Sequence, residues 1–142
     1  MITTKKILPV KSNKLPHLKV YTRIKPSKVH GVGVFAIQLI KKGTYIFFGD
    51  NEKMAWVKDT QIKKLPRALI KLYEDFCVIK KDKNGKFYLC PRNFNVLTVA
   101  WYINNSDDPN VGCDKNFDFF ALRNIRTGEE LTANYSTYSD EN

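Results

Sequence analysis

Residues 128–135 of this chain read Gly-Glu-Glu-Leu-Thr-Ala-Asn-Tyr, and this stretch carries most of the fold prediction. A glycine turn leads into the strand-like run Glu130 to Ala133, and a tyrosine follows close to the C-terminus. A tyrosine at the end of a strand usually packs its ring and turns its hydroxyl toward solvent. Taken alone, the stretch therefore predicts a turn, a short strand and an aromatic end.

A second informative stretch lies earlier, at residues 101–110, and reads Trp-Tyr-Ile-Asn-Asn-Ser-Asp-Asp-Pro-Asn. The apolar run Val96 to Ile103 stops there in a cluster of amide, hydroxyl and acidic side chains. The apolar run fits a buried strand and a short helix equally well. The polar cluster is also typical of an ordinary sharp loop.

The third stretch, residues 30–36, reads His-Gly-Val-Gly-Val-Phe-Ala. Two glycines one residue apart let the backbone approach a ligand closely before the strand-like run Val32 to Ile37. The third glycine and the following helix of a dinucleotide-binding fingerprint are missing. A glycine-assisted turn explains the pair as well as a binding loop does.

Short strand-like runs dominate the rest of the chain. Leucine and aromatic side chains at helical spacing predict an amphipathic helix over Pro66 to Phe76, with the proline in the first turn. The pair Asn84-Gly85 predicts a hairpin turn. We therefore expect a mostly β domain with one or two helices inserted midway. The other strand-like runs are Val20 to Ile24, Tyr45 to Phe48, Cys77 to Lys81, Lys86 to Cys90 and Asp118 to Leu122.

The chain has 142 residues, enough for one compact domain, and a net charge of +10. Residues 1–49 hold ten basic side chains and no acid, whereas residues 50–142 hold 14 of each sign, so the excess lies in the first third. Such a segment attracts phosphates or an acidic protein surface, which predicts nucleic-acid contact through residues 5–42. A solvated basic arm explains the charge equally well.

The three cysteines, Cys77, Cys90 and Cys113, are far apart in the sequence and form no C-x-x-C pair. We expect free thiols in a reducing compartment and no metal site. Residues 1–6 lack the apolar core of a signal peptide, and no apolar run reaches the ~18 residues of a membrane helix. The expectation is an intracellular protein, cytoplasmic or associated with chromatin, without a membrane segment.

In their order and spacing, the three stretches resemble the motifs of the SET-domain family of S-adenosylmethionine-dependent protein lysine methyltransferases. The family pattern N-H-S-C-x-P-N falls on residues 104–110, and E-L-T-x-D-Y falls on residues 130–135. The resemblance implies a mostly β fold of small curved sheets, with a C-terminal pseudoknot and a short helical insert. The implied organisation is a basic arm over 1–19, a SET domain over 20–138 with its helical insert over 60–77, and a tail over 139–142.

The resemblance also implies the position of the site and its cofactor, S-adenosylmethionine. Backbone groups of Gly31, Val32 and Gly33 would meet the methionine part of the cofactor, and Asn104 would bond its amino-acid end. Asn105 would contact the cofactor mainly through main-chain groups. Tyr135 falls on the catalytic tyrosine and also borders the cofactor. The implied cofactor-binding residues are Gly31, Val32, Gly33, Asn104, Asn105 and Tyr135.

The implied substrate is a protein that carries a target lysine, with histone tails as the family's familiar substrates. The implied substrate-binding residues are Tyr102, Ala133 and Tyr138. Ala133, where part of the family carries a bulkier aromatic, leaves room for more than one methyl transfer. Tyr138 would cover part of the lysine channel, a task that a second subunit of a homodimer or the substrate could equally perform. The acidic residues between Asp107 and Asp118 fit both a groove for a basic peptide and a solvated loop.

Three positions depart from the family pattern. Asn105 replaces a frequent histidine, Asn134 replaces a frequent aspartate, and Asp107 stands where many members have a zinc-binding cysteine. No cysteine follows Cys113, so the resemblance is to a zinc-free version without a cysteine-rich tail. These departures keep a second interpretation open: a non-catalytic SET-like module that binds nucleic acid or an acidic protein through its basic arm.

Overall fold

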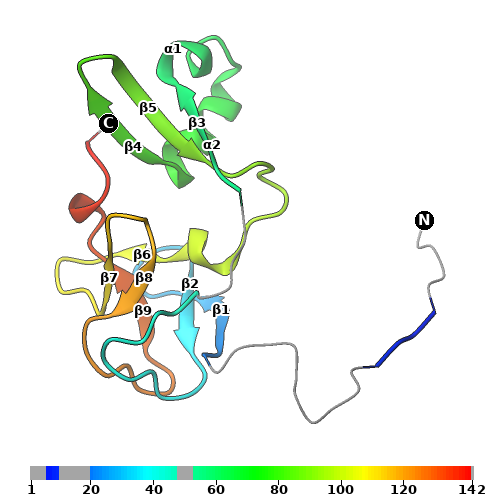
Figure 1. The fold of residues 1–142 in the computed structure, drawn as a ribbon, viewed down its shortest axis with the longest axis vertical. Helices are drawn as coiled ribbons and strands as arrows, with labels where there is room; N and C mark the ends of the chain where they lie inside the picture. The colour runs from blue at the N-terminus through cyan, green and yellow to red at the C-terminus, as the bar shows by residue number, and fades with distance from the viewer. Residues whose placement is uncertain (1–5, 10–19, 48–52, 142) are drawn as a thin grey trace.

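Two β-sheets divide the molecule into two parts (Figure 1). The computed structural model describes residues 6–9, 20–47 and 53–141. The larger sheet has six strands in the order β1-β2-β9-β7-β8, with β6 also paired to β9, and the smaller sheet has the order β3-β5-β4. The strands of the larger sheet are β1 (Thr22–Pro26), β2 (Val32–Ala36), β6 (Asn104–Asn105), β7 (Val111–Cys113), β8 (Phe119–Ala121) and β9 (Glu130–Ala133). The predicted mostly β fold of small sheets is confirmed.

Strand β9 organises the larger sheet. It pairs antiparallel with β2, where Val34 lies opposite Leu131, and parallel with β6, where Asn104 lies opposite Thr132. It also pairs in parallel with β7. Because β9 lies between the N-terminal strands and the mid-chain strands, the three sequence stretches singled out above become neighbours in space.

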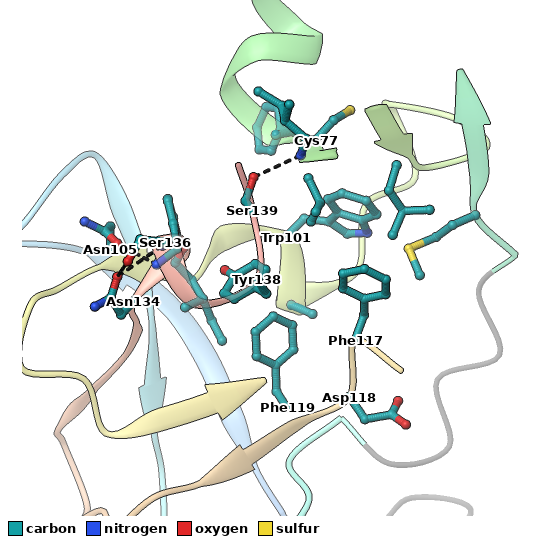
Figure 2. A pocket seen from close by; sticks show the side chains of 18 of the residues that line it. Cys77, Trp101, Asn105, Phe117, Asp118, Phe119, Asn134, Ser136, Tyr138 and Ser139 are labelled. Carbon is teal, nitrogen blue, oxygen red and sulfur yellow. Dashed lines mark hydrogen bonds between the residues drawn. The ribbon is translucent and has the colours of Figure 1, made fainter. Parts of the chain in front are cut away.

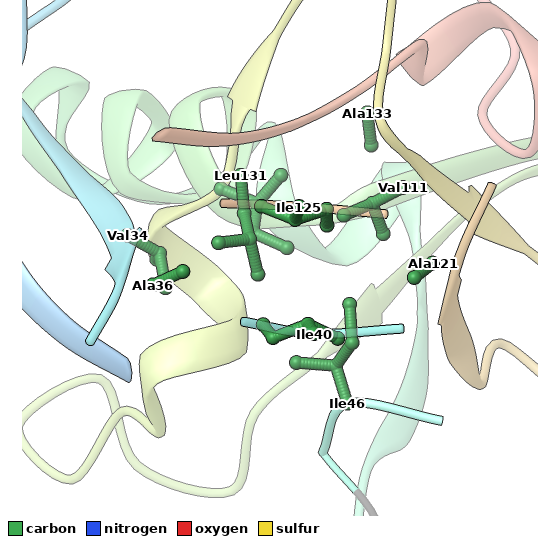
Figure 3. Close-up of a cluster of buried hydrophobic side chains, with 10 residues drawn as sticks. Val34, Ala36, Ile40, Ile46, Val111, Ala121, Ile125, Leu131 and Ala133 are labelled. Carbon is green, nitrogen blue, oxygen red and sulfur yellow. The ribbon is translucent and has the colours of Figure 1, made fainter. Parts of the chain in front are cut away.

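The core of the larger sheet follows from the two-residue alternation of its strands. Val34 and Ala36 on β2, and Leu131 and Ala133 on β9, point into one buried cluster (Figure 3). Burying each valine, leucine or isoleucine there contributes ~1.5–3 kcal/mol. The other buried members of this cluster are Ile40, Ile46, Ile103, Val111, Ala121 and Ile125.

The smaller sheet and two helices form an insert, residues 55–90, with a core of its own. Helix α2 begins directly after Pro66, so the predicted helix is confirmed to within one residue. The Asn84-Gly85 hairpin is also confirmed, with Gly85 at φ +125°. No helix in the described residues is both long and apolar enough to span a membrane. The insert comprises β3 (Ala55–Lys58), α1 (Asp59–Ile62), α2 (Arg67–Phe76), β4 (Val78–Asp82) and β5 (Gly85–Cys90).

Several elements differ from the sequence prediction. The ambiguous run 96–103 contains a 3₁₀ helix, η1 (Val99–Tyr102). The predicted strand at Tyr45 is reduced to an isolated bridge with Phe120, and Phe48 lies outside the described residues. Strand β7 was not predicted, because three residues are too few to show a period. Of the predicted basic arm, residues 1–5 and 10–19 also lie outside the described residues.

Candidate functional site

A cavity of about 1090 Å³ is lined by residues from both parts of the molecule. Figure 2 shows the rings of Trp101, Phe117, Phe119 and Tyr138 around it. Phe119 and Tyr138 meet edge to face at 5.6 Å between ring centroids, so one side of the cavity is aromatic and well packed. The opposite side comes from the end of α2 and the start of β4, residues 74–79.

Phe117 enters this aromatic side from an unusual backbone conformation. It has φ 63°, the only positive φ of a non-glycine residue in the described part of the chain. The Phe117 N–H donates to the Asp114 carbonyl at 3.0 Å, and the Asp114 carboxylate accepts from the N–H groups of Asn116 and Asp118 at 2.9 and 3.0 Å. Asp114 therefore holds the β7–β8 turn that presents Phe117 to the cavity.

Tyr135 lies at the cavity wall, at the start of the short 3₁₀ helix η2 (Tyr135–Thr137). Its backbone N–H donates to the Asn105 side-chain oxygen at 2.8 Å, and its hydroxyl donates to the Ile103 carbonyl. Asn134 caps η2 by accepting from the Ser136 N–H at 3.1 Å. Burial, and secondarily the charge of Glu130, raise the pKa of the Tyr135 hydroxyl. The phenol is therefore neutral at physiological pH.

A partly buried polar network joins the turn between β1 and β2 to β2, β6 and β9. The Asn104 side-chain nitrogen lies 2.9 Å from a Glu130 carboxylate oxygen and 3.0 Å from the Val32 carbonyl. Ser27 donates to the same carboxylate at 2.7 Å. A Cβ on Gly33 would lie 2.2 Å from that carboxylate, so a side chain there would force the carboxylate out of its place in the network. The network fixes the glycine stretch against Asn104.

The first glycine of the stretch has a different role. Gly31 has φ +47°, a conformation that favours glycine, and a Cβ there would meet no atom within 4 Å. Val32 beside it is 42% exposed. Asn104 thus holds this backbone at the Val32 carbonyl, while Gly31 and Val32 stay exposed and Gly33 is buried. This is what a segment that binds a small molecule through main-chain groups requires.

A sequence model of the SET domain matches residues 31–136 of the chain. The chain belongs to the SET-domain family. The match includes the glycine stretch and Asn104, which the polar network joins, and Asn105 and Tyr135, which line the cavity. Gly31, Val32, Gly33 and Asn104 are not among the residues that line it. A search of curated proteins found no match to this SET domain.

Solved structures share the fold of this SET domain. A Plasmodium falciparum candidate histone methyltransferase has a TM-score of 0.53 and 24% identity, covering 83% of this chain and 95% of that chain. The Neurospora SET domain protein DIM-5, a histone lysine methyltransferase, has a TM-score of 0.56 and 19% identity, covering 87% of this chain and 55% of that chain. A humanized mutant of the Chaetomium thermophilum Polycomb Repressive Complex 2, bound to the inhibitor GSK126, has a TM-score of 0.57 and 16% identity, covering 85% of this chain and 15% of that chain.

The structure separates the predicted substrate residues of the SET domain. Tyr138 lines the cavity together with Asn105 and Tyr135. Ala133 is only 1% exposed and belongs to the core of the larger sheet, and Tyr102 packs against that core. Ala133 and Tyr102 are not among the residues that line the cavity. Their contact with a substrate remains a prediction.

The cavity is acidic, although the chain as a whole is strongly basic. No lysine, arginine or histidine is among the described residues that line it, and of its acids Asp75 is paired with Lys71 outside the cavity at 2.6 Å. Asp114 is held in its charged form because hydrogen bonds, first of all from the Asp118 N–H, lower its pKa. The field inside the cavity therefore favours cations. The seven acidic lining residues are Glu74, Asp75, Asp107, Asp114, Asp118, Asp140 and Glu141.

The cysteines near the cavity are not activated. Burial and the charges of Asp114 and Asp118 raise the pKa of Cys113 to about 12. Contact with the thiol of Cys90 and burial raise the pKa of Cys77. Both groups are neutral thiols at neutral pH, which disfavours a thiolate nucleophile. In the described part of the chain, no three His, Cys, Asp or Glu side chains are placed to hold a metal ion.

Sequence reasoning missed the partners of the network, Ser27 and Glu130, and the structural role of Asn110. Glu130 stands inside the quoted Gly-Glu-Glu-Leu-Thr stretch, but its contact with the glycine stretch depends on strand pairing. Asn110 is the last residue of the asparagine motif and is only 2% exposed. Its amide donates to the Glu130 carbonyl at 2.8 Å and accepts from the Thr132 N–H at 2.9 Å.

We expect Asn110→Ala to lower the free energy of unfolding by about 2–4 kcal/mol, because it leaves a buried backbone N–H and carbonyl of β9 without partners. Urea unfolding followed by circular dichroism measures this loss. Asn95→Ala is the matched control, since Asn95 is exposed, and its effect is expected within about 0.5 kcal/mol. Equal stability of the two variants would contradict the role given to Asn110.

Proposed function

We propose that this SET domain is an S-adenosylmethionine-dependent protein lysine N-methyltransferase. The observation that carries the proposal is the position of Tyr135. Its neutral hydroxyl lies beside the Ile103 carbonyl at the wall of an acidic cavity, and its backbone is tied through Asn105 to the strand that also holds the glycine stretch. A cationic cofactor and a lysine side chain both suit such surroundings.

The residues present fit the cofactor. We assign Gly31, Val32 and Gly33 to its methionine part, because Asn104 fixes this backbone and its Gly31 and Val32 positions are exposed. Asn104 would bond its amino-acid end, and Asn105 would contact it mainly through main-chain groups. Asn104 also holds the Gly31–Gly33 backbone through the Val32 carbonyl, so its removal would affect binding in two ways. When bound, S-adenosylmethionine supplies a methyl group already activated by the sulfonium charge.

The chain's own contribution to the reaction is positioning. The target lysine amine must be unprotonated, although its ordinary pKa is about 10.4 and the acidic residues of the cavity favour its charged form. Burial of the amine and the positive charge of a bound cofactor would favour the neutral form. The Tyr135 hydroxyl and the Ile103 carbonyl would orient the amine for in-line attack. A phenol suits this task because it can donate and accept a hydrogen bond while staying neutral. Tyr138, whose ring lies 6.0 Å from that of Tyr135, would cover the channel.

The proposal extends to the family's pseudoknot and to the bounds of the domain. Strand β9 lies between β2 and β6, and we propose that this C-terminal segment completes the pseudoknot of the family. The domain would span residues 20–138, and it would work inside the cell on a protein substrate, with histones as the first substrates to test. Whether residues 5–42 contact nucleic acid is a separate proposal, to be tested by the salt dependence of binding.

The cavity also indicates the sequence around the target lysine. Asp107 and Asp118 line it, and neither side chain makes a hydrogen bond that would compete with a substrate in the described structure. A peptide with arginine beside the lysine would place positive charge against these acids. The substrate class we propose is therefore a lysine in a basic segment.

We expect the variant Asp107→Asn/Asp118→Asn to raise KM about 5–30-fold for a peptide with arginines beside its lysine, because it removes two favourable ion pairs. KM for an alanine-flanked peptide should change about twofold or less. Methyl transfer from labelled cofactor measures both constants. Asp82→Asn, at the end of β4 and outside the residues that line the cavity, is the control for loss of a surface carboxylate. An equal KM increase for both peptides would contradict electrostatic selection.

Calorimetric titration with S-adenosylmethionine and S-adenosylhomocysteine tests the proposed cofactor. The proposal expects saturable binding of both at one site per chain. Absence of binding, even with an arginine-flanked lysine peptide present, would favour the non-catalytic module instead.

A further inference from the structure

The C-terminal segment after Tyr135 runs from the larger sheet to the insert and lies along β4 (Figure 1). The Ser139 hydroxyl accepts a hydrogen bond from the Ile79 N–H at 2.9 Å. The Asp140 N–H donates to the Ile79 carbonyl at 2.8 Å, and the Asp140 carboxylate accepts from the Lys81 N–H at 2.7 Å. Two tail residues thus satisfy three backbone groups of one strand.

These three groups belong to an open sheet edge. The insert sheet has the order β3-β5-β4, so no strand among the described residues pairs with the outer side of β4. Ile79 and Lys81 are two residues apart and face the same side, as alternate residues of a strand do. Ser139 and Asp140 therefore occupy the edge in the way that an added strand would.

The same tail residues are bound to the Tyr135 turn at their other end. The Ser139 N–H donates to the Tyr135 carbonyl at 2.8 Å. Ser139 therefore connects the η2 turn directly to β4. The two parts of the molecule have separate cores. Other contacts between them include the ring pairs Phe76–Tyr102 at 5.7 Å and Trp56–Phe117 at 6.2 Å. The tail adds directional hydrogen bonds to these non-directional contacts.

The tail also borders the cavity. Ser139, Asp140 and Glu141 line it between the aromatic wall and the wall formed by residues 74–79 of the insert. The distance between the two walls thus depends on where the tail holds β4. A shift of the insert would change the width of the cavity without moving Tyr135.

We infer that Ser139 and Asp140 are positioning residues that latch the edge of the insert sheet to the Tyr135 turn and so set the width of the cavity for a substrate peptide. The latch itself is a property of the fold. Its effect on substrate rests on the proposed methyltransferase function. The two statements have separate measurements.

Residue-resolved amide hydrogen exchange by NMR tests the latch. Ser139→Ala should accelerate exchange at Ile79, and Asp140→Ala at Lys81, each by roughly threefold to tenfold. Ser139→Thr and Asp140→Asn keep the side-chain oxygen and should restore protection. The Thr132 amide, which is bonded to Asn110 in the other sheet, should be unchanged.

Glu141→Gln is the matched control for charge, because it removes a neighbouring carboxylate that makes no hydrogen bond to β4 in the described residues. It should leave the exchange of Ile79 and Lys81 unchanged. Unaltered exchange in both alanine variants, or equal acceleration at Thr132, would overturn the latch. These outcomes do not depend on any enzymatic activity.

Steady-state methyl transfer to an arginine-flanked lysine peptide tests the effect on substrate. The variant Ser139→Ala/Asp140→Ala should raise KM roughly threefold to tenfold and change kcat about twofold or less, and the conservative pair Ser139→Thr/Asp140→Asn should restore KM. If the double alanine variant had a lower melting temperature and an unchanged KM, Ser139 and Asp140 would have only a structural role. No transfer by the wild-type chain would count against the proposed function and leave the exchange result standing.

Discussion

Replacement of Tyr135 by phenylalanine is expected to lower kcat for lysine methylation by about 10²–10³-fold, the usual cost of losing one well-placed polar group in an active site. The substitution removes the hydroxyl that donates to the Ile103 carbonyl and keeps the ring that packs 6.0 Å from Tyr138. Affinity for S-adenosylhomocysteine is expected to change about threefold or less, because Asn105 bonds the backbone and not the side chain of Tyr135.

Single-turnover methyl transfer and calorimetry measure these two quantities on the same preparations. Tyr73→Phe is the matched control: it deletes a hydroxyl from a tyrosine in the core of the insert, outside the residues that line the cavity. The control should retain wild-type activity. If Tyr135→Phe were about as active as Tyr73→Phe, the Tyr135 hydroxyl would have no catalytic role.

Gly33→Ala is expected to lower the free energy of unfolding by about 2–4 kcal/mol and to weaken cofactor binding at least about tenfold. The added Cβ would lie 2.2 Å from the Glu130 carboxylate and 3.2 Å from the Asn104 side-chain nitrogen. The carboxylate must therefore leave its hydrogen bonds with Ser27 and Asn104. Urea unfolding and cofactor titration measure the two effects.

A double-mutant cycle identifies the cause of this loss. Glu130→Ala removes the atoms that the new Cβ would strike, so Gly33→Ala should cost little in that background. Additive effects of the two substitutions would show that the carboxylate is not what excludes a side chain at Gly33. In that case the network could not be the reason for the second glycine of the stretch.

Local patterns were sufficient for part of the fold. Helix α2 has apolar residues at helical spacing after Pro66, and the β4–β5 hairpin has an Asn-Gly turn, so each element could be predicted from its own residues. Strand β7 could not, because it has three residues and its Gly112 is required by the neighbouring Phe120 ring, 2.8 Å from where a Cβ would lie. Such a strand is determined by its partners.

The candidate site likewise has features that the sequence could predict and features that only tertiary contacts determine. The resemblance placed the glycine stretch, the asparagine cluster and Tyr135 in one site, and strand pairing brings these segments together. The contact between Glu130 and Gly33 and the pairing of the tail with β4 depend on tertiary structure alone. No spacing in the sequence predicts them, since their residues are about a hundred and about sixty positions apart.

Mass spectrometry of purified histones and of an arginine-flanked lysine peptide, each incubated with S-adenosylmethionine and the chain, tests the central claim most directly. The account predicts methyl groups on a lysine side chain of at least one substrate, with transfer lost in Tyr135→Phe and retained in Tyr73→Phe. Unmodified lysines in every substrate, from a folded protein that binds the cofactor, would contradict the methyltransferase assignment.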